Sequence, residues 1–330
     1  MCSLTVERAR ELLERCRGRC IAVVGDVMVD RYFWGSVTRI SPEAPVPVVD
    51  FEVEEVRLGG AANVAHNLHS LGLKPLLVGV IGQDVAGDTL LELARGLGFE
   101  TEALFRDPAR PTTEKIRILG NRQHLVRLDR EVRTPVDGNV VTHVLHLLEK
   151  VPDIEALIFQ DYNKGMLTPE LIRAVIELMS CRGVPVLADP KRDNFFAYVG
   201  VTLFKPNRRE AAQALQRGLR SVEDVRWAAC QLQERLRCRA VLLTLGEEGM
   251  FLREGDGRES LIPARAHHVA DVSGAGDTVI ATVAAALVAG ATFQEAALLS
   301  NFAAGVVCAE PGVVPIDPQA LLGALSYAEC

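Results

Sequence analysis

The sequence lacks the patterns that decide the class of many nucleotide-binding proteins at once. Its eight cysteines include no C-x-x-C pair, so reduced thiols are expected rather than a zinc site or a disulfide framework. No G-x-x-x-x-G-K-[ST] stretch occurs, which excludes a P-loop. No G-x-G-x-x-G follows the first apolar strand, where a dinucleotide-binding fold needs it. A nicotinamide-dependent oxidoreductase is therefore disfavoured.

Long apolar runs and excess positive charge are missing too. No apolar stretch is long and uninterrupted enough to span a bilayer. The arginine-rich, amphipathic N-terminus lacks the apolar segment of a signal peptide. The formal net charge of −7 argues against a general nucleic-acid binder. We expect a soluble cytoplasmic protein that binds neither nucleic acid nor membrane.

The 330 residues, of which 48% are hydrophobic, can form one large α/β domain. Apolar runs at 21–25, 76–82, 156–160, 185–189, 201–204 and 240–246 are predicted strands that alternate with helices such as 61–71, 87–97 and 221–237. This order predicts a doubly wound, mostly parallel sheet flanked by helices. Ligands bind beyond the carboxyl ends of such strands. The polar residues that follow the strands therefore predict one long cleft: Asp26, Asp161, Asp189, Lys191, Asn207 and Thr244.

Two insertions, at about 32–58 and 104–131, are predicted to leave the main sheet as a small β lid, with the rest of residues 1–330 as a single domain. The first is proline-rich and suits an edge strand. The second contains a hairpin, 113–119 with 124–128. Lys115, Arg117, Arg122 and Arg127 make this hairpin basic. Surface hairpins are often basic without a function, but in an acidic protein the pattern predicts an anionic group on the ligand.

The chain is organised around residues 271–278. Gly274, Ala275 and Gly276 open a long apolar segment, 279–290, that is predicted to be a buried helix. Bare N–H groups and the helix dipole make such a start an anion site. Asp277, in the first turn, can take a proton from a hydroxyl while these N–H groups stabilise a phosphoryl group in flight. The alternative is a tight turn into a helix capped by Ser273. We favour a kinase that acts on an alcohol.

Small and acidic residues near the first strand are candidates for substrate contacts. Asp26 and Asp30 follow that strand, where carboxylates can bond sugar hydroxyls, although Asp26 suits a turn cap equally well. Gly59 and Gly60 permit a close backbone approach. Asn63, in the first turn of the next helix, can bond a hydroxyl; the alternative is a helix start built from small packing residues.

Asn207 and Glu210 begin another helix, one turn apart. An amide oxygen and a carboxylate at this spacing can hold a hydrated Mg²⁺ next to phosphate. The same spacing satisfies a plain capping box. The residues alone do not separate the two interpretations.

Together these residues resemble the ribokinase-like (PfkB) sugar kinase family over essentially the whole chain. Residues 59–65 and 271–277 are similar to its two signatures, in the expected order. The resemblance implies an ATP-dependent kinase with Asp277 as general base, an anion hole formed by the N–H groups of 273–277, and Mg²⁺ at Asn207 and Glu210. The implied nucleotide contacts are Lys191, Asn207, Arg208, Arg209, Glu210, Thr244, Gly246, Gly249, Val269, Asn301 and Gly305.

One branch fits better within this family. Residues 25–35, 39–48, 122–129 and 161–165 look like those of the D-glycero-D-manno-heptose 7-phosphate kinases. The resemblance implies that D-glycero-β-D-manno-heptose 7-phosphate is phosphorylated at the C1 hydroxyl, giving the 1,7-bisphosphate, in ADP-heptose and lipopolysaccharide core precursor synthesis. Asp161 then joins the substrate site. Lys115, Arg122 and Lys164 become candidates for the existing phosphate.

Many relatives in this branch carry a fused nucleotidylyltransferase domain with an H-x-G-H motif. That motif does not occur in this sequence, so we expect the kinase alone, either as a monofunctional protein or as an excised domain. Exposed lid strands in the family often pair, which implies a homodimer through the lid. Two rival functions stay open: a kinase of the same family acting on another sugar, sugar phosphate or nucleoside, and a non-catalytic nucleotide-binding module.

Overall fold

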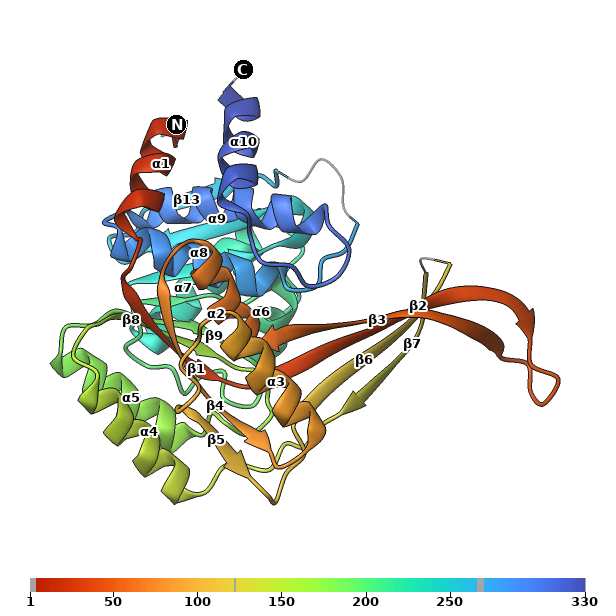
Figure 1. Cartoon of the computed structure of the whole chain (residues 1–330). Helices are drawn as coiled ribbons and strands as arrows, with labels where there is room; N and C mark the ends of the chain where they lie inside the picture. The colour runs from red at the N-terminus through yellow and green to blue at the C-terminus, as the bar shows by residue number, and fades with distance from the viewer. Residues whose placement is uncertain (1–3, 122, 266–269, 330) are drawn as a thin grey trace.

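The computed structural model describes residues 4–121, 123–265 and 270–329, which form a nine-stranded sheet flanked by helices and a separate lid (Figure 1). The sheet order is β13-β12-β11-β10-β9-β8-β1-β4-β5. Neighbouring strands of this order from β5 to β11 are parallel, whereas β12 pairs antiparallel with β11 and β13 pairs antiparallel with β12. The strands are β1 Cys20–Gly25, β4 Lys74–Gly82, β5 Leu104–Asp107, β8 Ile154–Gln160, β9 Val186–Asp189, β10 Leu203–Phe204, β11 Ala240–Thr244, β12 Met250–Glu254 and β13 Glu259–Ile262.

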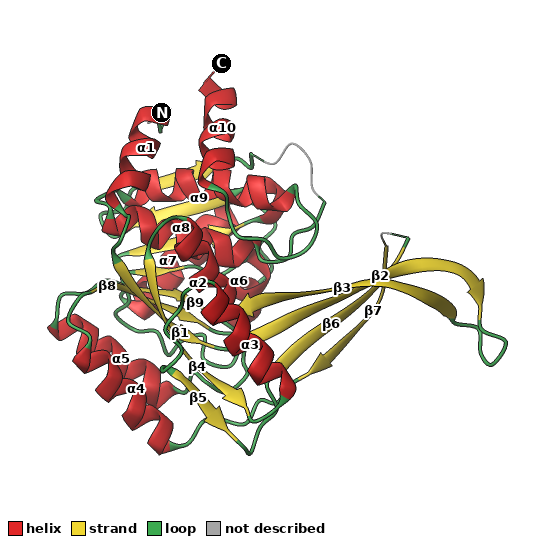
Figure 2. Ribbon diagram, in the orientation of Figure 1, coloured by secondary structure: helices red, strands yellow, loops and turns green. Residues whose placement is uncertain are grey.

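Helices cover both faces of this sheet (Figure 2). Successive side chains of a strand point to opposite faces, so Ile21 and Val23 of β1 join one apolar core, while Ala22 and Val24 join the other. The predicted doubly wound architecture is confirmed. The helices are α1 Val6–Arg15, α2 Ala61–Ser70, α3 Val85–Gly96, α4 Gly138–Lys150, α5 Pro169–Cys181, α6 Arg208–Ala214, α7 Val222–Leu236, α8 Ala275–Val288, α9 Phe293–Cys308 and α10 Pro318–Glu329. In the described ranges, no helix is both long and apolar enough to cross a membrane.

The lid is a four-stranded sheet in the described part of the chain, ordered β3-β2-β6-β7, which projects from the body (Figure 1). Its strands are β2 Val27–Ile40, β3 Pro47–Gly60, β6 Thr113–Gly120 and β7 Gln123–Arg130. The proline-led strand β3 lies at an edge, as predicted. Only Asp26 separates β1 of the body from β2 of the lid.

The predicted limits of the lid need correction. Residues 104–107 do not belong to it: they form β5, the edge strand of the main sheet, parallel to β4. Leu104 is buried in the main core, and this burial decides the partner of the strand. The first insertion also starts earlier than expected, because β2 runs from Val27.

Candidate active site

Helix α8 begins at a glycine that no side chain caps. The N-cap is Gly274, whose φ of 79° lies in the left-handed region that favours glycine. A Cβ at this position would lie 3.0 Å from Nδ2 of Asn63, so the backbone conformation favours glycine and the space for a side chain is tight. Ser273 does not cap the helix, and that alternative is wrong.

The N–H groups expected to form the anion hole are only partly free. The N–H of Ser273 donates to the Asp271 carboxylate at 2.9 Å. The N–H of Ala275 lies 3.3 Å from a carbonyl oxygen of the same turn. Within the described residues, the N–H groups of Gly276 and Asp277 have no hydrogen-bond acceptor. Fewer N–H groups are therefore available to an anion than residues 273–277 were expected to supply.

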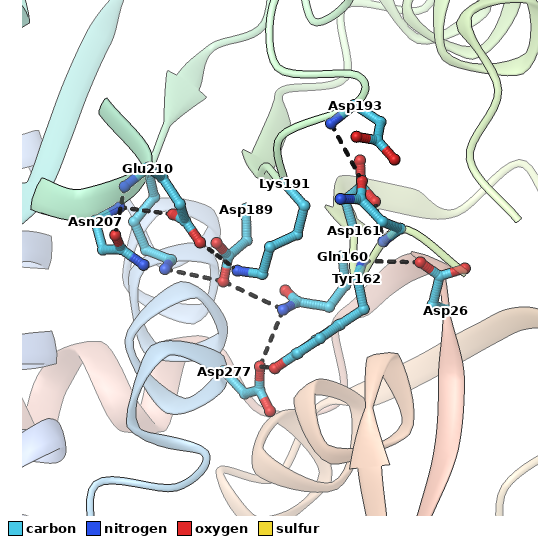
Figure 3. Close-up of polar contacts among 12 residues, drawn as sticks. Asp26, Gln160, Asp161, Tyr162, Asp189, Lys191, Asp193, Asn207, Glu210 and Asp277 are labelled. Carbon is cyan, nitrogen blue, oxygen red and sulfur yellow. Dashed lines mark hydrogen bonds and ion pairs between the residues drawn. The ribbon is translucent and has the colours of Figure 1, made fainter. Parts of the chain in front are cut away.

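Three side chains donate hydrogen bonds to the buried carboxylate of Asp277. Asn63 of α2 donates to Oδ2 at 2.8 Å. Oδ1 accepts from Nε2 of Gln160, at the end of β8, at 2.9 Å, and from the hydroxyl of Tyr162 at 2.7 Å (Figure 3). Asn63 thus orients the predicted base, and one of its two amide N–H groups is already used in doing so.

Burial raises the pKa of Asp277 to about 6, and the negative charge of Asp189 adds to this. The hydrogen bonds from Asn63 and Tyr162 oppose the shift because they favour the ionised form. A carboxyl group with this pKa is ionised at neutral pH and still basic enough to accept a proton during a reaction. Its environment therefore suits a general base.

A cavity of about 770 Å³ lies beside Asp277, between the carboxyl edge of the sheet and α8 and α9. Its volume suits a ligand of nucleotide size. Most of the residues implied as nucleotide contacts meet there. Glu210 does not line the cavity, and Val269 lies outside the described residues. The expected residues that do line it are Lys191, Asn207, Arg208, Arg209, Thr244, Gly246, Gly249, Ala275, Gly276, Asp277, Asn301 and Gly305.

Two lysines bring positive charge to the end of this cavity near α8. Lys205, directly after β10, is buried in an ion pair with Asp189 at 2.9 Å. A Cβ on Gly276 would lie 3.6 Å from its Nζ, so the ammonium faces the start of α8. Burial disfavours the charged form of Lys191, yet Asp189 and Glu210 outweigh burial and raise its pKa. Lys191 can therefore face an anion in its charged form.

The spacing of Asn207 and Glu210 produces a complete capping box at the start of α6. Glu210 also accepts from Lys191 (Figure 3), so protein donors contact both of its carboxylate oxygens. No group of three or more His, Cys, Asp or Glu side chains suited to a metal occurs in the described ranges. The pair fits a hydrated Mg²⁺ held through water and phosphate oxygens, not a cage of protein ligands.

Asp26 and Asp161 hold the loop that follows β8. Asp26 accepts from the N–H groups of Tyr162 at 2.8 Å, Lys164 at 3.0 Å and Met166 at 3.1 Å. Burial, and next the charge of Asp161, raise the pKa of Asp26 to about 6. The carboxylate of Asp161 accepts from the side chains of Tyr198 and Asn194 and from a loop N–H group. The geometry favours a loop-fixing function over sugar contact for both acids.

Asp30 forms a buried ion pair with Arg117 of β6. A Cβ on Gly59 would lie 2.1 Å from Oδ2 of Asp30, so Gly59 leaves the space this carboxylate occupies. Gly60 is the N-cap of α2. Arg117 belongs to the predicted basic hairpin, but its charge is already paired and is not available to a ligand.

The predicted phosphate-binding lysines differ in their surroundings. Lys164 is paired with Glu131 at 2.6 Å. Lys115 forms no ion pair with any described residue, and its Nζ lies 4.9 Å from the centre of the Tyr162 ring. Burial lowers the pKa of Lys115, and the charge of Asp30 opposes that shift. Arg122 lies outside the described residues.

Sequence reasoning missed Gln160, Tyr162 and Lys205 as parts of the site. Gln160 donates both to Asp277 and, at 3.2 Å, to Asp189. Gln160 therefore connects the predicted base to the buried ion pair of Lys205 and Asp189. Gln160 ends β8, Tyr162 is two residues beyond it, and Lys205 directly follows β10, so the rule that polar residues after strands face the cleft could have found them.

Comparison with known proteins places this site in a family. The family model described as "pfkB family carbohydrate kinase" matches residues 19–320. The chain is 41% identical over 318 residues to the bifunctional protein HldE of Pelobacter propionicus, covering 96% of this chain and 65% of that protein. The chain thus spans about two thirds of the length of the curated relatives it matches.

Solved structures share the fold at low sequence identity. The structure of Escherichia coli phosphofructokinase-2 in complex with fructose-6-phosphate has a TM-score of 0.78 and 16% identity, covering 95% of this chain and 100% of that chain. The structure of Arabidopsis thaliana ribokinase complexed with ribose and ATP has a TM-score of 0.72 and 19% identity, covering 94% and 99%. These structures support the ribokinase-like architecture.

Proposed function

The chain belongs to the pfkB family of carbohydrate kinases, and from this membership we propose that it transfers the γ-phosphoryl group of ATP to the C1 hydroxyl of D-glycero-β-D-manno-heptose 7-phosphate. The observation that carries the proposal is the carboxylate of Asp277 at the open start of α8, beside a cavity of nucleotide size. The choice of heptose rests on the motifs at 25–35, 39–48 and 161–165 and on relatives named HldE at about 40% identity. We place the reaction in the cytoplasm.

Asp277 is the general base in this reaction. It accepts the proton of the sugar hydroxyl while the oxygen of that hydroxyl bonds to the γ-phosphorus and ADP leaves. Asn63 and Gln160 hold the carboxylate in place through their hydrogen bonds. The free N–H groups of Gly276 and Asp277 stabilise the transferred phosphoryl group.

Positive charge for the phosphates comes from Lys191 and Lys205, which line the cavity that we assign to ATP. We propose Asn207 and Glu210 as the residues that would hold Mg²⁺ through its water ligands. When bound, the ion neutralises charge on the phosphate oxygens. Asn301 and Gly305 of α9 form the cavity wall expected for the adenine ring.

The 7-phosphate requires a cation on the lid side of Asp277. Lys115 is the best-supported candidate because it comes from the lid strand β6, lies beside Tyr162 and has no ion-pair partner among the described residues. Lys164 would have to leave Glu131 to take part. Arg122 stays a candidate by resemblance only.

We also propose that two copies of the chain pair through their lids. Large apolar side chains are exposed on the β2–β3 hairpin and on β7. Such a patch on a projecting sheet is typical of an interface. The exposed residues are Ile40, Val46, Phe51, Val53, Leu125, Val126 and Leu128.

A substrate panel with ATP tests the assignment. We expect D-glycero-β-D-manno-heptose 7-phosphate to be preferred over the unphosphorylated heptose, over fructose phosphates and over nucleosides, with the product carrying a new phosphate at C1. Asp277→Asn should lower kcat by about two to four orders of magnitude with little change in ATP affinity. A preference for an unphosphorylated sugar would refute the substrate, and unchanged turnover in Asp277→Asn would refute the base.

A further inference from the structure

Of the three donors to Asp277, only Tyr162 adjoins open space. The side chains of Asn63 and Gln160 are fully buried. Tyr162 is partly buried and lines the cavity. Tyr162 is therefore the donor that a ligand in the cavity meets beside Asp277, which lines the cavity too.

The hydrogen bonds that the Asp277 carboxylate already accepts also point to the hydroxyl of Tyr162. Oδ1 accepts from both Gln160 and Tyr162, which uses its two lone pairs. Oδ2 faces Asn63, in the buried contact between α2 and α8. Oδ2 keeps one acceptor site beside Asn63, whereas at Oδ1 a hydroxyl that arrives from the cavity can donate only by replacing the hydroxyl of Tyr162, the donor that lines the cavity.

The backbone of Tyr162 is fixed, whereas its ring is held by contacts that can be exchanged. Asp26 accepts the N–H groups of Tyr162 and of the loop beyond it. The centre of the ring lies 4.9 Å from Nζ of Lys115 and 5.2 Å from Nζ of Lys191, both within cation–π range. One lysine comes from the lid and the other from the body, so the ring connects the two parts.

We propose that Tyr162 is a gate on the catalytic base. While sugar is absent, its hydroxyl occupies the acceptor position on Asp277 and keeps water from being activated against ATP; an arriving sugar hydroxyl displaces it. The prevented reaction is ATP hydrolysis: a water oxygen bonds to the γ-phosphorus, the bond from that phosphorus to the bridging oxygen of ADP breaks, and the water proton passes to Asp277. The inference rests on the proposed function of Asp277 as the base.

The test is release of inorganic phosphate from ATP and Mg²⁺ without any sugar. Tyr162→Phe keeps the ring but removes the hydroxyl, and we expect release to rise about tenfold or more, the value of a lost hydrogen bond to a charged group. Asp277→Asn combined with Tyr162→Phe should return release to background. The matched control is Tyr198→Phe, which removes a phenol from Asp161 without touching Asp277; there we expect no rise.

A pH profile separates a gate from a structural contact. The hydrogen bond from Tyr162 favours the ionised form of Asp277 and lowers its pKa, against the burial that raises it. Without the hydroxyl, the acid limb of kcat/KM, which reports the free enzyme, should move to higher pH. The acid limb of kcat should stay in place, because in the complex with sugar the phenol has already left.

Two results would overturn the gate. One is a rate of phosphate release without sugar that is no faster in Tyr162→Phe than in Tyr198→Phe. The other is loss of phosphoryl transfer as severe as in Asp277→Asn, which would make Tyr162 a proton relay. The sugar-free assay does not depend on the heptose: failure to phosphorylate heptose 7-phosphate, with a rise in release, would refute the substrate alone. Equal release in Tyr162→Phe with and without Asp277 would refute the base.

Discussion

Two glycines at the start of α8 have different surroundings. Gly274 has a left-handed φ of 79°, and an added Cβ would lie 3.0 Å from Asn63. Gly276 lies inside the helix, where a Cβ would make only ordinary contacts with Lys205 and Asp189. The first glycine is thus required by the backbone, whereas the second leaves room beside the free N–H groups.

Alanine substitutions should separate these two requirements. Gly274→Ala should lower the free energy of unfolding by about 1–2 kcal/mol, the cost of the left-handed conformation for a residue with a Cβ. Gly276→Ala should leave stability unchanged or slightly raised, because alanine favours a helix. It should still slow phosphoryl transfer about tenfold or more by displacing the phosphate. Urea unfolding and initial rates measure both, and equal destabilisation by the two substitutions would contradict this assignment.

The site could be predicted from sequence where one segment carries its own chemistry. Asp277 was predicted because glycines, a carboxylate and an apolar helix stand next to one another. Gln160 ends β8 and Lys205 follows β10, and only the sheet order brings them to Asp277. Asn63 was predicted as a sugar contact, but the sequence cannot show that α2 packs against α8, which turns its amide to the base instead.

The lid depends on a buried charge pair between neighbouring strands. Arg117 of β6 pairs with Asp30 of β2, and both are buried. Arg127, opposite Arg117 on β7, pairs with Asp129 in solvent. Arg117 and Arg127 can therefore be compared directly, since the two ion pairs differ mainly in burial.

Replacing each arginine by alanine tests how much burial contributes. Arg117→Ala leaves the Asp30 carboxylate buried without its partner and should lower the free energy of unfolding by about 3–5 kcal/mol. Arg127→Ala removes an exposed pair and should change it by less than about 1 kcal/mol. Equilibrium urea unfolding measures both values. A similar small loss in both variants would mean that water reaches Asp30.

Strands that are continuous apolar runs can be predicted well from the sequence, whereas the short strand β10 cannot. The apolar runs at 21–25 and 156–160 match β1 and β8 closely, since buried parallel strands are apolar on both faces. The run at 201–204 yields only a two-residue strand, Leu203–Phe204, because Gly200 donates to the carbonyl of Leu236 and holds the chain in a turn. Such contacts join residues that are distant in sequence, and no local pattern reports them.

Several large exposed apolar side chains lie on the lid, which projects away from the body of the molecule (Figure 1). Phe51 and Val53 belong to the edge strand β3 and are both exposed. A second copy that covers this patch would remove it from water and give the edge strand a partner.

A charge placed in this patch should split the proposed dimer. Phe51→Asp with Val53→Asp should weaken association by about 2 kcal/mol or more, as expected for a buried apolar anchor. Sedimentation velocity over a range of concentrations measures the change. The control is Leu261→Asp on β13, a residue of the body that is also exposed and should leave association unchanged. A wild-type protein that sediments as a monomer at all concentrations would exclude the dimer.

The cavity beside α8 ends at a phenol, and this bears on the design of inhibitors. In the proposed complex with ATP, a compound that copies the nucleotide and extends past its terminal phosphate would meet the hydroxyl of Tyr162, whose ring centre lies 4.9 Å from Nζ of Lys115 and 5.2 Å from Nζ of Lys191. A short rigid extension that ends in a hydrogen-bond acceptor and an anionic group would match that wall. Selectivity over other ATP-dependent enzymes can thus be sought at this end of the cavity, away from the adenine.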